Sequence, residues 1–236
     1  GGMGRSFDGS YAEFTTVPEQ QVQTLETSLP WSTLAALPEM TQTAFGALYR
    51  GIAFSPGDTI LIRGGTSSVG LMASLIAREH GCTVVATTRN EDRIAALKRY
   101  GAHHAIVDNG AIAGRVRQYR RDGVDAVLDL IGTRVFQNNL DALREGGTLC
   151  LAGILGGEWT LQKFSPMFDL PSKKRLVAYV GDEKDFMRTP LQDIADMVAR
   201  EEITPPIART LPFESLPDAH RELEANNIPG KWVMTI

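Results

Sequence analysis

The segment from Thr59 to Gly70, TILIRGGTSSVG, constrains the fold of this chain more than any other feature. Its apolar run from Ile60 to Ile62 is too short for an isolated helix but suits a strand buried in a parallel sheet. Two glycines end the run, and beyond them apolar residues recur at helical spacing, namely Val69, Met72, Ala73, Leu75 and Ile76. The segment therefore predicts a strand, a tight turn and an amphipathic helix that runs from Val69 to His80.

The turn nearly matches the G-x-G-x-x-G fingerprint of dinucleotide-binding folds. Gly65 and Gly70 occupy the outer positions, and Ser67 replaces the middle glycine. A serine still lets a pyrophosphate approach and adds a hydroxyl donor, while the start of the helix offers unpaired N–H groups and a partial positive charge. A purely structural turn explains the same residues, so the motif alone leaves both readings open.

Downstream of the turn, apolar strand-like runs alternate with helical patterns. Strands are predicted at 83–88, 105–107, 125–130, 148–152 and 175–180, and helices at 90–100, 113–121, 135–144 and 191–199. This alternation predicts an α/β fold, a doubly wound six-stranded parallel Rossmann sheet. Ligands of such sheets bind outside the carboxyl ends of the strands, which here read GGTSSVG, TTRN, VDNG, LIG and AGILGG.

Composition favours a small-molecule partner. The 236 residues carry a net charge of −4 with scattered Lys and Arg, which argues against a nucleic-acid or polybasic membrane surface. No apolar run reaches the length of a membrane helix, and no signal peptide opens the chain. The two cysteines, Cys82 and Cys150, fall inside predicted apolar elements, so a cytoplasmic location is expected.

The end of the second strand bears on the choice of cofactor. An acidic residue there would bind the ribose hydroxyls of NAD, whereas arginine accepts the 2′-phosphate of NADP. This chain has Thr88 and Arg89 at the strand end and Arg93 one turn later, with no carboxylate at the tip. NADP(H) is therefore favoured over NAD(H), although a solvated helix face is the simpler explanation of either arginine alone.

Several longer motifs are more specific than the glycine turn. They are GSYAEF, LAALPEMTQTAFGAL, RGGTSSVG, GVDAVLDLIG, LREGGTLCLAGILGG and the terminal PDAHRELEANNIPGKWVMTI. With them the chain resembles, over essentially its whole length, the medium-chain dehydrogenase/reductase family and its zinc-free quinone oxidoreductase (zeta-crystallin-like) branch. The resemblance implies a partial, mostly β GroES-like catalytic domain at 1–32 and 205–236, a Rossmann domain at 33–204, and a leading catalytic segment that this sequence lacks.

The resemblance also implies roles for individual residues. Thr43 would lie near the nicotinamide, and Lys231 near the cofactor cleft. Thr66, Ser67, Ser68, Val69 and Gly70 would form the pyrophosphate turn, and Arg93 would meet the 2′-phosphate. Two strand-end loops would flank the nicotinamide and its ribose, formed by Leu130, Ile131 and Gly132 and by Gly153, Ile154 and Leu155. Asp108 departs from the family, because several relatives place a tyrosine there and a carboxylate would weaken a 2′-phosphate contact.

A zinc site is not expected. Zinc-dependent relatives use Cys and His ligands, whereas Cys82 and Cys150 are far apart in sequence and EMTQTAFG contains no cysteine. His103 and His104 are neighbours in or before a strand, where side chains point to opposite faces and do not chelate one ion. His220 belongs to an amphipathic helix, and Tyr49, Tyr100 and Tyr179 are assigned to structure.

The resemblance implies an NADPH-dependent oxidoreductase that transfers a hydride to a quinone or an α,β-unsaturated carbonyl compound, with no catalytic acid identified. Two alternatives stay open. An enoyl-thioester reductase would have a long acyl channel beside the loop from Phe164 to Lys174, and a non-catalytic NADPH-binding protein would bind cofactor without turnover. A short-chain dehydrogenase is a poor alternative because no Tyr-x-x-x-Lys pair occurs. The sixth strand, from Arg175 to Val180, is an apolar sheet edge, which the family uses to form a homodimer.

Overall fold

The computed structural model describes residues 2–225 and 228–236. Asn226 and Asn227, which belong to the terminal motif, lie outside the described residues. The chain forms two compact units, one of Gly1–Thr43 with Val180–Ile236 and one of Ala44–Tyr179. The predicted division into a Rossmann domain and two catalytic-domain pieces stays a prediction.

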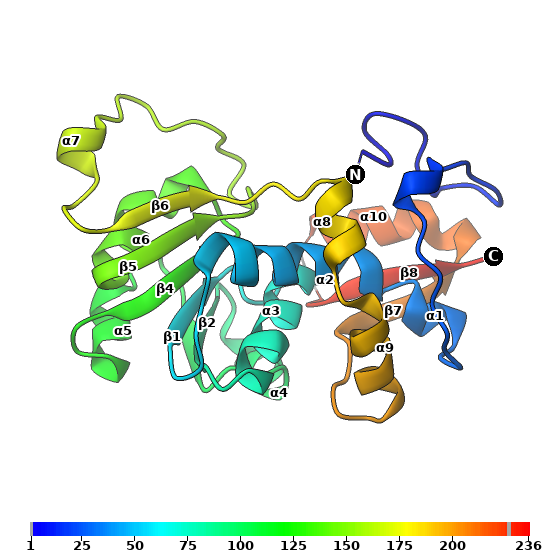
Figure 1. Ribbon diagram of the computed structural model, residues 1–236, viewed down its shortest axis with the longest axis horizontal. Coiled ribbons are helices and arrows are strands. Elements are labelled where there is room, and N and C mark those ends of the chain that lie inside the picture. Colours follow the sequence, from blue (N-terminus) through cyan, green and yellow to red (C-terminus); the bar gives the residue numbers. More distant parts are fainter. Residues whose placement is uncertain (1, 226–227) are drawn as a thin grey trace. The chain divides into compact units, whose positions relative to one another are not determined.

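The unit of Ala44–Tyr179 is built on one parallel sheet of six strands (Figure 1). The strands are β1 (Thr59–Arg63), β2 (Thr83–Thr88), β3 (His104–Val107), β4 (Val124–Asp129), β5 (Leu143–Leu151) and β6 (Arg175–Ala178). Their order, β3-β2-β1-β4-β5-β6, is that of the Rossmann fold and confirms the predicted doubly wound sheet. The order reverses between β1 and β4, and ligands of such sheets bind at that point.

Helices cover both faces of this sheet. They are α3 (Ser68–Glu79), α4 (Ile94–Arg99), α5 (Ala113–Tyr119) and α6 (Phe136–Ala142), and the short α7 (Pro166–Asp169) lies in the connection between β5 and β6. Each predicted helix exists, but the one expected to reach residue 144 ends at Ala142. Leu143 already pairs with Val124, and a bulge in the β4–β5 ladder extends β5 toward its amino end.

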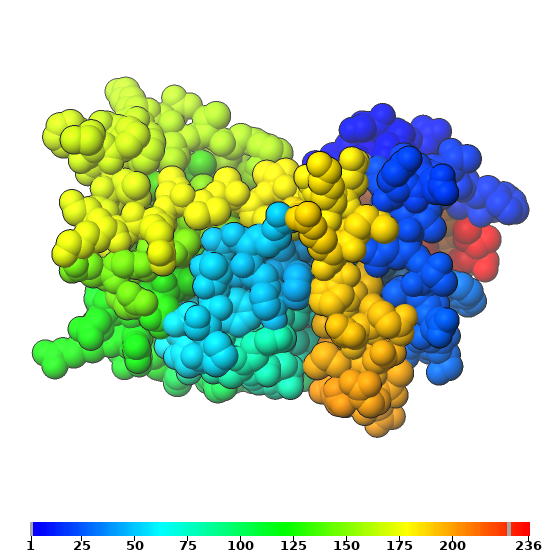
Figure 2. All heavy atoms as spheres, viewed as in Figure 1, coloured from blue at the N-terminus to red at the C-terminus, as the bar shows by residue number. Residues whose placement is uncertain are grey.

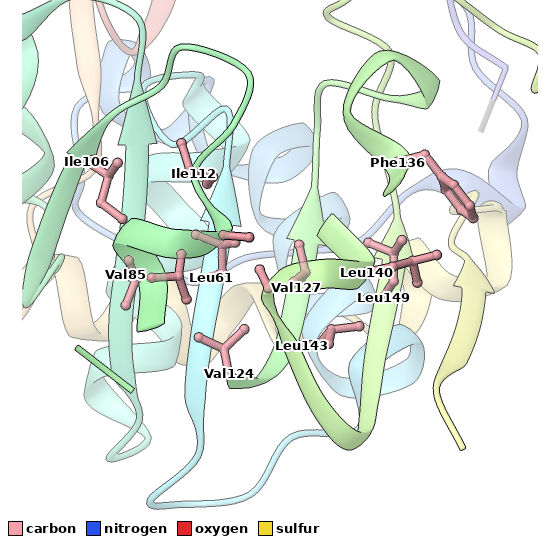
Figure 3. Packing of buried hydrophobic residues seen from close by; sticks show 13 residues of the cluster. Leu61, Val85, Ile106, Ile112, Val124, Val127, Phe136, Leu140, Leu143 and Leu149 are labelled. Atoms are coloured by element: carbon pink, nitrogen blue, oxygen red, sulfur yellow. The ribbon is translucent and has the colours of Figure 1, made fainter. Parts of the chain in front are cut away.

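A continuous apolar core lies between the sheet and the helices α5 and α6 (Figure 3). It combines inward-facing strand residues such as Leu61, Val127 and Leu149 with Val116 of α5 and Leu140 of α6, all fully buried. Contacts of α3 with β1 and β2, and of α4 with β2 and β3, cover other strands of the sheet. Burial of whole strands explains why they read as unbroken apolar runs.

The other unit contains short helices and a two-stranded parallel sheet. Its helices are α1 (Trp31–Leu34), α8 (Glu183–Arg188), α9 (Leu191–Ala199) and α10 (Leu216–Glu224), and α2 (Leu37–Gly46) begins in it. Strand β7 (Ile207–Pro212) pairs with β8 (Lys231–Thr235). β7 ends at Pro212, and a 3₁₀ turn (Phe213–Ser215) leads from it directly into α10.

The strand-like pattern GSYAEF does not form a strand. Residues 9–14 are irregular, residues 10–14 are exposed, and the only bridge before residue 30 in the described part joins Met3 and Phe7. A strand needs a neighbouring backbone to accept its hydrogen bonds, and within the described residues this segment has none.

A fully buried arginine ties together the carboxyl edge of the six-stranded sheet. Arg63, the last residue of β1, donates from Nε and Nη2 to both carboxylate oxygens of Asp108, at 2.7 and 2.9 Å. Its other bonds reach Asn138 (3.1 Å) and Asn139 (3.0 Å) on α6 and the carbonyl of Gly110 (2.9 Å). These five bonds use all five guanidinium donors, which a buried charge requires.

The pairing also sets the ionisation of Asp108. Burial raises the pKa of this carboxyl, but hydrogen bonds from Arg63 and from the Gly110 amide outweigh burial, so the pKa is lowered. The carboxylate is therefore ionised at neutral pH, and its stabilising contribution is lost only as the pH falls through that lowered pKa.

Gly70 allows α3 to approach the turn that precedes it. A Cβ at this position would lie 2.6 Å from the Gly64 carbonyl oxygen and 2.8 Å from the Cα of Gly65. Both neighbours are backbone atoms that cannot rotate away. Gly70 thus has the packing role of the third glycine in the dinucleotide fingerprint.

We predict that Arg63→Met lowers the free energy of unfolding by about 3–5 kcal/mol, because it leaves the Asp108 carboxylate buried without its partner. Urea denaturation followed by circular dichroism measures the change. The control Arg78→Ala removes a half-exposed pair with Glu79 and should cost less than about 1 kcal/mol. Equal effects of the two substitutions would contradict the role given to Arg63.

Gly70→Ala should lower the free energy of unfolding by about 1–3 kcal/mol, since the added methyl group overlaps fixed backbone. The matched control is Gly114→Ala in α5, where a Cβ meets no atom within 4 Å. That substitution should raise stability by about 0.5 kcal/mol. Thermal unfolding of both variants in parallel checks this, and a harmless Gly70→Ala would refute the packing role.

Candidate functional site: the carboxyl edge of the six-stranded sheet

The glycine turn between β1 and α3 is closed by Ser67. Gly64 has φ +83°, which favours glycine, and Ser67 donates from its hydroxyl to the Gly64 carbonyl at 2.9 Å. The same hydroxyl accepts the N–H of Gly70 at 3.1 Å and so caps α3. The serine hydroxyl is therefore used within the turn, and the free donor expected from the sequence is not present.

Three backbone amides, in the glycine turn and at the start of α3, have no hydrogen-bond partner in the described part of the chain. No hydrogen bond is found there for the N–H groups of Thr66, Ser68 and Val69, although the adjacent Gly70 and Leu71 amides both bond to Ser67. Unpaired N–H groups and the helix dipole favour an anion at such a position. The turn is thus arranged to accept a phosphate.

The turn is fixed to the end of β2 through Thr87. The Gly64 amide donates to the Thr87 hydroxyl at 3.2 Å, and the Gly65 amide donates to the Thr87 carbonyl at 3.0 Å. Thr88, which follows, is buried, and its hydroxyl lies 3.2 Å from the Asn90 amide. These bonds bring the β1 turn and the β2 tip together, as the sequence predicted.

Two arginines lie beyond the β2 tip. Arg89 is exposed and Arg93 is half-buried in a 3₁₀ turn that Asn90 caps through a 2.9 Å bond to the Asp92 amide. Burial, followed by the charge of Arg89, lowers the pKa of Arg93. The electrostatic effect indicates that the two guanidinium groups are neighbours, and this arrangement favours an anion between or beside them.

The loops after β4 and β5 interlock. Leu155 donates from its amide to the Leu130 carbonyl (2.9 Å), and Gly156 donates to the Ile131 carbonyl (2.8 Å). A Cβ at Gly153 would lie 2.7 Å from the Leu130 carbonyl oxygen, so only glycine allows this approach. The structure thus brings Leu130, Ile131 and Gly132 together with Gly153, Ile154 and Leu155.

The same loops reach the glycine turn. A Cβ on Gly64 would lie 3.1 Å from Cδ1 of Ile131 and 3.4 Å from Cδ1 of Leu155. The β2 tip, the glycine turn and the two loops therefore form one continuous edge. Most of the residues predicted from the sequence to bind a cofactor lie along it.

Asp129 is a residue of this edge that the sequence patterns did not identify. It ends β4, is fully buried, and accepts the amides of Ile131 (2.8 Å) and Gly132 (3.2 Å). Burial raises its pKa to about 6, although these amides and Arg63 act in the opposite direction. The sequence does carry one signal for this residue, because a charged side chain at the end of an apolar strand is unusual. Asp129 stands at such a position in LDL, and Arg63 stands at one in LIR.

Thr43 and Lys231 belong to the other compact unit, and their roles near the cofactor stay predictions. Within that unit the ammonium of Lys231, at the start of β8, pairs with Glu39 on α2. Glu39 precedes Thr43 by one helical turn, which places the ion pair on the same face of α2 as Thr43.

The described residues do not provide a zinc site. No group of three or more His, Cys, Asp or Glu side chains is arranged to hold a metal in residues 2–225 and 228–236. Cys82 and Cys150 are buried free thiols, and burial raises their pKa values to about 11 and about 12. His103 accepts the Val84 amide, and His104 stacks on Tyr119.

No helix in the described part of the chain has the length and apolar character needed to cross a membrane.

The known proteins that this chain resembles include dehydrogenases and quinone oxidoreductases. The family model described as "Zinc-binding dehydrogenase" matches residues 68–191. An NAD-dependent alcohol dehydrogenase of Saccharolobus solfataricus is 27% identical over 98% of this chain and 66% of its own length. The quinone oxidoreductase of Mus musculus is 28% identical over 63% of this chain and 46% of its own length. The chain therefore spans about two thirds or less of these two relatives.

Solved structures agree on the fold. A mycobacterial protein complexed with NADPH superposes with a TM-score of 0.84 at 26% identity, over 97% of this chain and 72% of that protein. The structure of AibC gives a TM-score of 0.84 at 26% identity, over 99% and 64%. With a family model matching more than half of the residues and a Rossmann strand order, this chain belongs to the zinc-binding dehydrogenase family of medium-chain dehydrogenases/reductases and is quinone oxidoreductase-like.

Proposed function

We propose that this chain binds NADP(H) along the carboxyl edge of its six-stranded sheet, as part of an oxidoreductase that reduces a quinone or an α,β-unsaturated carbonyl compound. One observation supports this most strongly. The unpaired amides at the start of α3 belong to the same continuous edge as a pair of arginines and two interlocked glycine loops. A dinucleotide needs these three features, for its pyrophosphate, its adenosine ribose and its nicotinamide end.

The arginines favour the phosphorylated cofactor. The β2 tip, at Thr88 and Arg89, has no carboxylate to bind ribose hydroxyls, and Glu91 and Asp92 belong to the 3₁₀ turn that follows. Asp108, whose charge was expected to oppose a 2′-phosphate, directs both carboxylate oxygens to Arg63. The mycobacterial neighbour complexed with NADPH supports the same choice, whereas the Saccharolobus relative is described as NAD-dependent.

The reaction requires few groups from the protein. When bound, the nicotinamide cofactor supplies the hydride, and the protein contributes orientation and exclusion of water. The Ser68 and Val69 amides would hold the pyrophosphate, and Leu130, Ile131 and Leu155 would provide an apolar wall beside the nicotinamide. Zinc independence is part of this proposal, because the donor set of the described residues does not fit a zinc ion.

The free edge of β6 supports a homodimer. β6 ends the strand order, so its outer side lacks a neighbouring strand in the described part of the sheet, and Val180 just beyond it is 82% exposed. The segment before it holds α7, whose Met167 and Phe168 are each 89% exposed; this yellow-green segment lies at the outer surface in Figure 2. Unpaired strand edges with apolar neighbours favour pairing with a second copy.

We further propose a cytoplasmic location.

Arg93→Ala should weaken NADPH binding by about tenfold or more, because it removes a charge-assisted bond to the 2′-phosphate, and should leave NADH binding within about twofold. Titration with each nucleotide, followed by nicotinamide fluorescence, measures both. The control Arg99→Ala changes an exposed arginine of α4 that lies over Tyr100. Equal losses for NADPH and NADH would argue against 2′-phosphate recognition, and no binding of either to the wild type would overturn the proposal.

Sedimentation velocity at about 10 µM should show a dimer for the wild-type chain and a shift toward monomer for Val180→Lys, which places a charge beside the paired edges. Leu223→Lys, on the exposed face of α10, is a control that should remain dimeric. A wild-type monomer at that concentration would rule out the β6 interface.

A further inference from the structure

We propose that the carboxylate of Asp129 is a positioning residue that holds the Leu130–Ile131–Gly132 loop in its nucleotide-receiving conformation, so that protonation of Asp129 weakens nucleotide binding. This inference rests on the proposed cofactor site. It concerns a residue that would not itself touch the reacting atoms but would act through the loop next to it.

The geometry shows how Asp129 acts on the loop. One carboxylate oxygen accepts the amides of Ile131 (2.8 Å) and Gly132 (3.2 Å), and the second oxygen also lies 3.2 Å from the Gly132 amide. Gly132 has φ +98° and ψ −154°, a conformation that is nearly restricted to glycine. The carboxylate therefore fixes the loop at its least common backbone conformation.

The loop so fixed touches the rest of the candidate site. The Leu130 and Ile131 carbonyls accept the amides of Leu155 and Gly156 from the β5 loop, at 2.9 and 2.8 Å. Ile131 also packs against Gly64 in the glycine turn. A change in the bonds to Asp129 is thereby transmitted to both neighbouring loops.

The charged groups around Asp129 act on its pKa in opposite directions. Arg63 on β1 stabilises its ionised form, whereas Asp108 after β3 opposes it, and two of the hydrogen bonds from Arg63 go to Asp108. Cys150 on β5 also interacts with Asp129 and stays a neutral thiol near neutral pH because burial raises its pKa to about 12. With burial as the largest effect, the pKa of Asp129 rises to about 6.

An ionised carboxylate at this position costs stability, which argues for a functional role. Because the folded-state pKa is above that of an unfolded chain, Asp129 stabilises the fold most at low pH, and this contribution is lost as the pH rises through about 6. At neutral pH the chain thus keeps a buried charge where a neutral Asn would also accept both amides. The gain from the charge is stronger hydrogen bonds to the loop, since charge-assisted bonds are roughly twice as strong as neutral ones.

The test compares Asp129 with Asn and Ala by calorimetric titration with NAD⁺ at about pH 7.5 and about pH 5. NAD⁺ is the probe because it lacks the 2′-phosphate, a group that itself titrates near about pH 6. At the higher pH, Asp129→Asn should bind about threefold to tenfold more weakly than the wild type, and Asp129→Ala more weakly again by a similar factor. At the lower pH, the wild type should fall to the level of the Asn variant, whose affinity should not change.

Asp125→Asn is the matched control, because Asp125 lies on the same strand and accepts the Thr59 amide at 2.7 Å, at the opposite edge of the sheet. Its NAD⁺ affinity should keep the wild-type pH dependence. A purely structural role of Asp129 would lower the thermal midpoint of its variants but leave the pH dependence of affinity intact, and that result would overturn the proposal.

A second measurement needs no nucleotide. In ¹⁵N-labelled protein, the amide shifts of Ile131 and Gly132 should titrate with a midpoint near the pKa of about 6 in the wild type and not in Asp129→Asn. Unchanged shifts in the wild type would refute the positioning role. If the shifts titrate but neither NAD⁺ nor NADP⁺ binds at either pH, the proposed cofactor site is wrong, and with it the predicted link between Asp129 and affinity.

Discussion

The buried guanidinium of Arg63 is the interaction on which the carboxyl edge of the sheet depends. Its five donors reach Asp108 and Gly110 after β3 and two asparagines on α6, so one side chain connects β1 to segments on both sides of the sheet's switch point. A buried charge persists only when its partners are all in place, and removal of one partner is costly. The candidate cofactor site is therefore built on a polar network, whereas the remainder of the unit is held by apolar packing.

Two carboxylates near this network differ in pKa because their surroundings differ. Asp108 receives two bonds from Arg63 and one from the Gly110 amide, and its pKa is lowered despite burial. Asp129 receives only backbone amides, and burial raises its pKa to about 6. The first is a permanent charge that stabilises the fold, and the second is a titratable group that controls a loop. Such pairs of groups with separated pKa values are common at functional sites.

The sequence predicted the parallel sheet well because its strands are buried on both faces and read as apolar runs between glycines. It also placed the β2 tip, the glycine turn and the two strand-end loops on one edge, since parallel strands end together. Three features were beyond it. The hydroxyl of Ser67 is used within the turn, GSYAEF has no neighbouring strand among the described residues, and the partners of Arg63 come from distant segments. Each depends on a contact between residues far apart in sequence or on local hydrogen-bond geometry, which periodicity does not encode.

A crystal structure of the chain grown with NADP⁺ would test most directly whether the carboxyl edge receives NADP(H). We predict the pyrophosphate at the amides of Ser68 and Val69, the 2′-phosphate beside Arg93, and the nicotinamide ribose against the loop that Asp129 holds. A cofactor bound elsewhere, or a 2′-phosphate turned away from both arginines, would contradict it.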